Sequence, residues 1–402
     1  MKTYFKVRSI STIIFLVFLF GFSAINIYYS GKDVFNEIQT SIDNNLSPKE
    51  FVDTVDAKIN DKVIYKEAFI ETYGYIQKLM DKNEFSNFSV VKDKDGKMHY
   101  TYFATGANPT EELSDRTTKF AREMKKQGTN FVYLMPPDKY VEGVTEFPTG
   151  IPYSYSNETA DNFLNELEEN NVDYIDFRDN ILNSGIDKDK LFFDTDHHWT
   201  IESSFWAFTE LTKQLNEKYD LDLDKDKFYT DINNYNSILY PKSYLGSMGR
   251  KTGMLYGGVD DFTLIYPKFN TSYSYYTDSK SQEFELEGRF EESLILSYPF
   301  NANLDLLDTG SDKYSTYLLG NRPLVQITNN NNPKGLKVLF VKDSFIVPTA
   351  AFFSSMCSQV DLIDPRYYEG DIVEYAKNQD YDFVFLSVYP QDLVEEFFPF
   401  FE

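Results

Sequence analysis

The chain has 402 residues, of which 42% are hydrophobic and 17% aromatic, so it can bury a large core and is not disordered. Its 39 basic and 63 acidic residues give a formal net charge of −24. This acidity argues against nucleic-acid binding and against docking on an anionic membrane surface, because no basic face is available to neutralise phosphates.

The N-terminus predicts a membrane anchor. Residues 1–9 carry basic residues and no acid, and residues 10–27 contain no charge, which is just long enough to span a bilayer as a helix. The basic flank should stay in the cytoplasm and the rest of the chain should lie outside. A cleaved signal peptide is the alternative. We favour an uncleaved anchor over residues 10–28, because cleavage after Ala24 would put bulky Phe22 where a small residue is preferred.

The cysteine content limits which covalent links the chain can form and indicates the kind of organism that it comes from. Cys357 is the only cysteine, so no intramolecular disulfide can form. An exported chain without disulfides, rich in lysine and asparagine, suggests a Gram-positive bacterial surface protein. The thiol lies in the apolar stretch "AAFFSSMCSQV" and is expected to be a buried small residue, not a nucleophile.

The segment after the anchor is expected to be an extension that precedes the main domain. Residues 29–60 are polar and mixed and predict a stalk, and residues 61–82 have a helical pattern. The stretch "MHYTYF" (98–103) alternates like a strand, and we assign its His99 a structural role. We therefore place the stalk and N-terminal extension at residues 29–110.

From residue 111 the pattern alternates between helix and strand. Helices are predicted at 111–128, 157–171, from Thr200 onward, near 348–357 and at 370–378. Short apolar runs predict strands at 130–137, 172–178, 336–341, 360–364 and 381–388. This alternation predicts an α/β domain over residues 111–402, with a parallel sheet covered by helices on both faces.

The alternation stops between residues 220 and 332. This stretch is rich in Tyr, Asn and Asp and is predicted to be a large insertion into the α/β domain. Its "DLDLDKD" (220–226) superficially resembles a calcium loop, but Lys225 stands at the sixth position, where an EF-hand needs glycine. We do not expect calcium there.

The stretch "DTDHHWT" (194–200) holds two of the three histidines of the chain and has three interpretations. A metal site is disfavoured, because neighbouring residues on a helix or strand point in different directions, so Asp196, His197 and His198 should not easily reach one ion. Helix capping by Thr200 explains part of the stretch and is compatible with a further role. A serine hydrolase site needs a histidine base, an acid that fixes its tautomer and a serine on a sharp turn.

The serine that a serine hydrolase site requires is offered further along the chain, at Ser344. Asp196 and His198 are two residues apart and can face the same side of a loop. In "KVLFVKDSF", an apolar strand is followed by Ser344 and then by a predicted helix, so Ser344 stands where open α/β sheets bind ligands.

"TDHHWT" together with "VKDSF" resembles the DHHW proteins, which are related to the alginate O-acetyltransferases of the SGNH hydrolase superfamily. The resemblance covers roughly residues 55–402 and implies an SGNH-hydrolase-like, flavodoxin-like fold. It implies Ser344 as the nucleophile, His198 as the base and Asp196 as the orienting acid. Lys342 departs from the superfamily, which has glycine two residues before the serine.

The resemblance also implies an oxyanion hole built from glycine and asparagine. "YLLGNRP" offers Gly320 and Asn321 for it, and "GSMGRKTG" offers Arg250 as a substrate contact. Turn formation is the alternative role of these glycines. No cofactor and no metal is implied.

Three functions remain open. The first is a membrane-anchored extracellular O-acetyltransferase that acts on a cell-surface or secreted polysaccharide. The second is a carbohydrate acetyl esterase with the same triad, and the third is a non-catalytic polysaccharide-binding component of an export or modification complex. Relatives work beside a multipass membrane O-acyltransferase that carries the acyl group outward, so the resemblance implies such a partner.

Overall fold

The structure is a computed structural model that describes residues 2–44, 46–278 and 283–401. The chain divides into two compact units, residues 1–73 and residues 74–402. Each unit is described by itself, and the α/β fold belongs to the second.

The first unit is mainly helical. It contains α1 (Lys2–Asp43), α2 (Pro48–Asp61) and the first part of α3 (Lys66–Leu79). By length and composition α1 could cross a membrane, with a mean hydropathy of 2.3 in its apolar window, a test that an N-terminal signal sequence also passes. The predicted stalk at 29–60 is largely helix, because residues 32–43 offer no glycine or proline to end α1. The predicted helix at 61–82 begins later, at Lys66.

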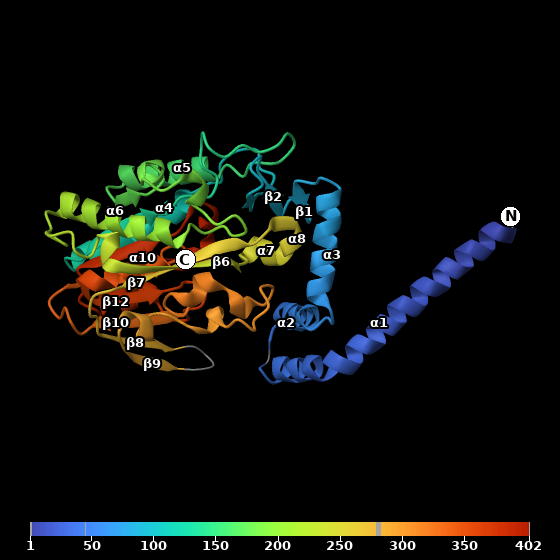
Figure 1. Ribbon diagram of the computed structural model, residues 1–402. Coiled ribbons are helices and arrows are strands. Elements are labelled where there is room, and N and C mark those ends of the chain that lie inside the picture. The colour runs from blue at the N-terminus through green and yellow to red at the C-terminus, as the bar shows by residue number, and fades with distance from the viewer. Residues whose placement is uncertain (1, 45, 279–282, 402) are drawn as a thin grey trace. The chain divides into compact units, whose positions relative to one another are not determined.

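The second unit is built on an eight-stranded sheet with the order β5-β4-β13-β11-β12-β10-β8-β9. Five strands are parallel, and β10, β8 and β9 extend the sheet as antiparallel strands. Figure 1 shows β12, β10, β8 and β9 side by side. The bounds are β4 Asn130–Met135, β5 Asp173–Asp176, β8 Tyr273–Asp278, β9 Phe284–Gly288, β10 Leu324–Asn329, β11 Leu336–Lys342, β12 Cys357–Ile363 and β13 Phe383–Ser387.

The five parallel strands have a flavodoxin-like arrangement with a shifted starting point. Counted from β11 through β12 and β13 and then back to β4 and β5, the strands lie in the spatial order 2-1-3-4-5. The strand that leads to Ser344 is therefore first in this count, although it follows β4 and β5 in the chain. This order brings the loop after β5 and the turn after β11 to the same edge of the sheet.

Helices cover both faces of the sheet, as predicted. One apolar core lies between the sheet and α4, α5 and α11, and the other lies between the sheet and α6 and α10. The central strands are apolar throughout because both of their faces are buried. The helix bounds are α4 Glu111–Lys126, α5 Ser156–Glu169, α6 Ile201–Tyr219, α10 Val347–Phe353 and α11 Ile372–Lys377.

Residues 220–332 supply three strands of the main sheet and a separate hairpin. The hairpin pairs β6 with β7, and the remaining helices of this stretch are short. The bounds are β6 Tyr235–Tyr244, α7 Ser247–Thr252, α8 Met254–Gly257, β7 Asp260–Pro267 and α9 Phe290–Ser293. The stretch therefore completes the sheet.

A small three-stranded sheet precedes α4. It consists of β1 (Glu84–Phe85), β2 (Val90–Lys92) and β3 (Met98–His99). The strand predicted over "MHYTYF" is wrong beyond His99. Residues 100–103 are irregular because the chain turns away from β2, and the Thr101 hydroxyl donates to Pro152 O at 3.1 Å.

Candidate active site

Ser344 lies two residues after the end of β11, at the carboxyl end of the parallel strands. Its strand is the first in the flavodoxin-like count and lies beside β13, the third, so Ser344 occupies the switch point where ligands bind in open α/β sheets. The preceding Asp343 is fully buried and fixes the turn. Its carboxylate accepts hydrogen bonds from the backbone amides of Phe345 at 2.8 Å and Tyr389 at 2.7 Å.

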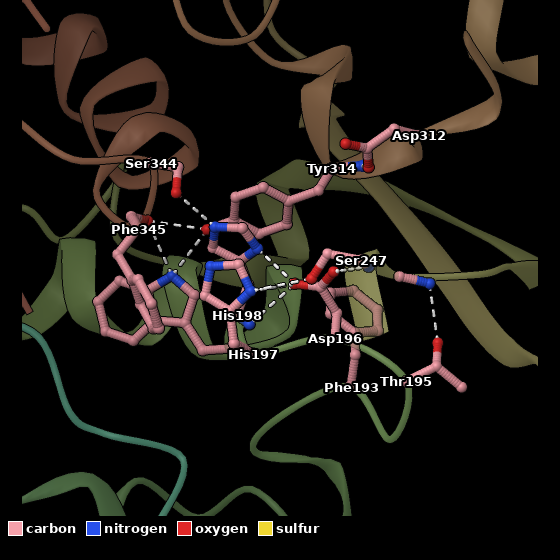
Figure 2. Close-up of polar contacts among 12 residues, drawn as sticks. Phe193, Thr195, Asp196, His197, His198, Ser247, Asp312, Tyr314, Ser344 and Phe345 are labelled. Atoms are coloured by element: carbon pink, nitrogen blue, oxygen red, sulfur yellow. Dashed lines mark hydrogen bonds and ion pairs between the residues drawn. The ribbon is translucent and has the colours of Figure 1, made fainter. Parts of the chain in front are cut away.

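The structure brings Asp196, His198 and Ser344 together in a hydrogen-bonded line (Figure 2). His198 Nε2 lies 2.6 Å from Ser344 Oγ, and His198 Nδ1 lies 2.5 Å from Asp196 Oδ1. The same oxygen of Asp196 accepts the backbone N–H of His198 at 3.0 Å. This is the spatial arrangement of a serine nucleophile, its base and an orienting acid.

Asp196 is fully enclosed, and its second oxygen is also used. Oδ2 accepts the Ser247 amide at 2.5 Å, at the start of α7. Burial alone would raise the pKa of Asp196, but His198, His197 and the hydrogen bonds hold it well below its usual range. The acid is therefore a carboxylate that accepts the Nδ1 proton of His198 and leaves Nε2 free to take a proton from Ser344.

The loop that carries Asp196 is held at two points. Asp260, the first residue of β7, accepts the amides of Asp194 at 2.8 Å and Thr195 at 2.9 Å. The buried ammonium of Lys139, which follows β4, donates to the carbonyl oxygens of Phe193 at 2.5 Å, Asp194 at 3.0 Å and Asp196 at 2.8 Å. An irregular loop buried in this way needs such partners, because its backbone groups cannot pair in a sheet.

Aromatic rings surround His198. Tyr314 stacks on its imidazole with ring centroids 3.9 Å apart. Trp199 is buried and donates from Nε1 to the Tyr314 hydroxyl at 3.1 Å and to Phe345 O at 3.0 Å, so it packs against the residues that surround His198. Thr200 caps α6, as predicted, and accepts the Ser203 amide.

The three residues open onto a cavity of about 580 Å³. Apart from the triad, its lining is polar and aromatic and contains basic side chains. The lining includes Tyr100, Tyr102, His197, Ser247, Arg250, Lys251, Asp312, Tyr314, Gly320, Asn321, Arg366, Tyr389, Gln391 and Asp392.

The two residues predicted for the oxyanion hole, Gly320 and Asn321, differ in the hydrogen bonds that they make. Gly320 lines the cavity and has a φ of +77°, and its amide donates to Tyr317 O at 3.0 Å within a turn. Its part in an oxyanion or substrate site stays a prediction. Asn321 lines the cavity, and its Oδ1 accepts the Lys342 ammonium at 2.8 Å. Among the residues that the structure describes, Asn321 Nδ2 has no hydrogen-bond partner, so it can donate into the cavity.

Lys342 and Arg250 are both held by protein groups. Lys342, which replaces the glycine of the superfamily, is buried and also donates to Asp364 at 3.0 Å. Arg250 lines the cavity, but its guanidinium donates to Leu245 O at 2.6 Å and lies 3.6 Å from Asp312. It remains a candidate substrate contact only through its remaining N–H groups.

The sequence argued against a metal site because the side chains of adjacent residues in a helix or strand point in different directions. This expectation does not hold here. The segment is neither helix nor strand, and donor atoms of Asp196, His197 and His198 lie within 4.8 Å of one another. The His198 nitrogens are both engaged, however, one with Asp196 and the other with Ser344. The same atoms serve the triad, so the cluster does not point to a separate metal site.

The other histidine and the cysteine lie away from the cavity. His99 is buried in β3, where its Nε2 lies 2.9 Å from Asp93, consistent with the structural role predicted for it. Cys357 is buried, as expected, and burial raises the pKa of its thiol far above the ordinary value.

Sequence reasoning missed Ser247, Tyr314, Lys139 and Asp260. Only two of them had a signal: Ser247 follows glycine at a helix start in "LGSMG", and Lys139 follows the strand 130–137 that was predicted to be buried. Tyr314 and Asp260 lie in the stretch without a periodic pattern, so nothing in the sequence brought them to the site.

Comparisons with known proteins identify the class of the domain. Residues 97–237 match the family model described as SGNH hydrolase-like domain, acetyltransferase AlgX. The chain carries an SGNH hydrolase-like domain. The matched range includes Asp196 and His198, and it ends before Ser344. A comparison with curated protein sequences found no match.

Solved structures share the fold of this SGNH hydrolase-like domain. The structure of Bacillus cereus PatB1 with a sulfonyl adduct is 19% identical, with a TM-score of 0.62, and the match covers 78% of this chain and 98% of PatB1. A DHHW family protein from Eubacterium siraeum is 18% identical, with a TM-score of 0.58, and the match covers 77% and 93%. The resemblance to DHHW proteins and alginate O-acetyltransferases that the two motifs predicted is confirmed.

Proposed function

We propose that the protein is an O-acyltransferase that moves an acetyl group to hydroxyls of a cell-surface or secreted polysaccharide through an acyl-serine at Ser344. The observation that carries the proposal is the line of short contacts from Ser344 through His198 to Asp196 at the mouth of a cavity. The match of residues 97–237 to an acetyltransferase domain supports the acyl chemistry.

The first half of the reaction acylates the serine. Ser344 Oγ attacks the acyl carbonyl while His198 Nε2 takes the hydroxyl proton, and Asp196 stabilises the imidazolium. The oxyanion accepts hydrogen bonds from the Ser344 amide, which has no partner within the described residues, and from Asn321 Nδ2. The carbonyl then re-forms, the bond to the donor's oxygen breaks, and His198 returns the proton to that oxygen.

The second half transfers the acyl group. An acceptor hydroxyl approaches the acyl-serine, His198 Nε2 removes its proton, and the new ester forms as the bond to Ser344 Oγ breaks. His198 then gives the proton back to Ser344. Transfer requires that the acceptor, and not water, occupies the position next to His198, so the residues around His198 decide between a transferase and an esterase.

The location belongs to the same proposal. The apolar helix α1 anchors the protein in the cell membrane by a single pass, and the second unit lies outside a bacterial, Gram-positive cell. A donor on that side must be delivered across the membrane, and a multipass membrane O-acyltransferase would supply it. The polysaccharide is then the acceptor.

The experiment uses the full chain in detergent with p-nitrophenyl acetate as the donor and an oligosaccharide as the acceptor. Mass spectrometry should find acetyl on Ser344 and on the sugar, and the Ser344→Ala variant should give neither. Free acetate without acetylated sugar would favour the esterase. Sugar binding by a wild-type protein that never becomes acetylated on Ser344 would favour the non-catalytic component.

A further inference from the structure

The second histidine of the motif, His197, has no part in the triad but lies against it. Its imidazole lies against that of His198, with ring centroids 3.9 Å apart and a tilt of 36° between the ring planes. Its side chain is 21% exposed and lines the cavity beside Ser344. A histidine placed this close to the base and open to the cavity can touch whatever His198 deprotonates.

A chain of hydroxyls favours one tautomer of His197. The Tyr100 hydroxyl donates to Ser247 Oγ at 3.1 Å, so the hydrogen of Ser247 is free for His197 Nδ1, which lies 3.2 Å away. In this arrangement Nδ1 accepts and the ring hydrogen is assigned to Nε2, with Asp196 Oδ1 lying 3.3 Å from Nδ1. Burial, reinforced by the neighbouring His198, lowers the pKa of His197 to about 3, so the ring stays neutral.

The two imidazoles point the same way. Nδ1 of His198 and Nδ1 of His197 lie 2.5 Å and 3.3 Å from the same oxygen, Asp196 Oδ1. Because Nε2 lies across the ring from Nδ1, both Nε2 atoms face away from Asp196, toward the side where Ser344 lies (Figure 2). His198 Nε2 contacts Ser344, and His197 Nε2 has no hydrogen-bond partner within the described residues.

We infer that His197 selects the acyl acceptor: its Nε2–H binds an oxygen on the carbon next to the one that bears the attacking hydroxyl. The inference rests on the proposed function, because the attacking hydroxyl is the one that His198 Nε2 deprotonates. Two neighbouring imidazoles, tilted by 36°, present one acceptor and one donor nitrogen toward the same side, which suits a hydroxyl and a neighbouring oxygen. The acceptor class is thus a 1,2-dioxygenated unit, such as a sugar diol or a hydroxymethyl group beside a ring oxygen, and not an isolated alcohol.

The test is a competition between two acceptors. The full chain receives p-nitrophenyl acetate with equal amounts of trans-2-methoxycyclohexanol and cyclohexanol, and the two acetate esters are quantified by mass spectrometry. The wild-type protein should favour the methoxy alcohol by about 3–10-fold more than the His197→Phe variant does, since one neutral hydrogen bond contributes that much. Comparing variants cancels the different intrinsic reactivity of the alcohols.

Two further variants guard the interpretation. His197→Gln carries an amide that can donate from near the Nε2 position, so it should recover part of the preference even if His197→Phe folds poorly. His99→Phe removes the other histidine outside the triad, which does not line the cavity, and should keep the wild-type ratio. A ratio that is the same in the wild type and in His197→Phe would overturn the inference.

Failure of the inference and failure of the proposed function give different results. If Ser344 becomes acetylated and both alcohols are esterified without a preference that depends on His197, the proposed function stands and the role of His197 falls. If the wild-type protein shows no acetyl group on Ser344, the acyl-serine mechanism itself falls.

Discussion

The Asp196 carboxylate makes its polar contacts inside the protein. The substitution Asp196→Asn replaces one of its oxygens by an amide nitrogen and therefore tests the role of its charge while keeping its shape. In Asp196→Asn the amide replaces an oxygen that accepts from His198 Nδ1 or from the Ser247 amide. An amide that donates to Nδ1 forces the proton of His198 onto Nε2, where it blocks the base. We expect the rate of Ser344 acetylation to fall by about 10³–10⁴-fold, with the thermal unfolding midpoint little changed.

The matched control is Asp194→Asn, two residues earlier in the same loop. The Asp194 side chain is half exposed and lies 3.9 Å from Lys97, away from His198. Its acetylation rate, measured by the burst of p-nitrophenolate, should stay within about twofold of the wild type. Equal losses in the two variants would show that the loop, and not the tautomer of His198, responds to the substitution.

His197 also makes stability depend on pH. Its pKa is lowered by burial and by His198 from 6.5 to about 3, so between these pH values the unfolded chain binds a proton that the folded chain does not. The contribution of His197 to the free energy of unfolding is therefore fully present above pH 6.5. It is lost as the pH falls, by up to about 1.4 kcal/mol per pH unit.

The measurement is urea unfolding of the second unit at pH 7, 6 and 5. The free energy of unfolding should fall less steeply for His197→Phe than for the wild type, so the wild type should lose stability relative to the variant on acidification. Parallel pH profiles would mean that His197 is protonated equally in the folded and unfolded chains, in contradiction to the lowered pKa of its folded state.

At the scale of elements, the helices and strands with a periodic or continuously apolar sequence were predicted. The elements that depend on contacts with distant parts of the chain were missed. The strands β4, β11 and β13 were predicted because they are buried on both faces and therefore read as apolar runs. β8 and β9 were missed because their sequences are rich in Tyr and Glu. Asp196 and His198 lie in one loop, so the sequence could predict that they are close. Whether Ser344 lies near them depends on the order of the strands in the sheet, which the sequence does not show.

The loop from residue 193 to 196 has no regular structure, so its shape depends on Lys139. In Lys139→Met the apolar chain fills the same space but leaves the carbonyl oxygens of Phe193 and Asp196 without the ammonium. We expect a loss of roughly 2–5 kcal/mol in the free energy of unfolding, because buried carbonyls lose their partner. Lys188→Met, at an exposed position, should change stability by less than about 0.5 kcal/mol.

A second readout separates the loop from general stability. In Lys139→Met the folded protein should also acetylate Ser344 more slowly at a temperature well below unfolding, because Asp196 and His198 follow the loop. A variant that is less stable but fully active when folded would show that Lys139 supports the fold without positioning the triad.

At the scale of the whole molecule, the proposed transferase would need access to both a donor and a polymer, and α1 would fix where that happens. The helix is exposed along its apolar window, as expected for a segment that meets lipid and not protein. The net charge of −24 gives no electrostatic attraction to an anionic bilayer, so attachment would depend on α1 alone.

This dependence gives the last prediction. The full chain, expressed in a Gram-positive host, should stay in the membrane fraction after alkaline carbonate washing and should keep residues 1–28 in its intact mass. Replacing Leu16 and Leu19 by Asp puts two charges near the middle of the apolar segment, at about 2.5–3.5 kcal/mol each, and should prevent stable insertion. The matched variant with both leucines replaced by Ile should remain in the membrane. Release of a wild-type protein that lacks its first residues would instead identify the segment as a cleaved signal peptide.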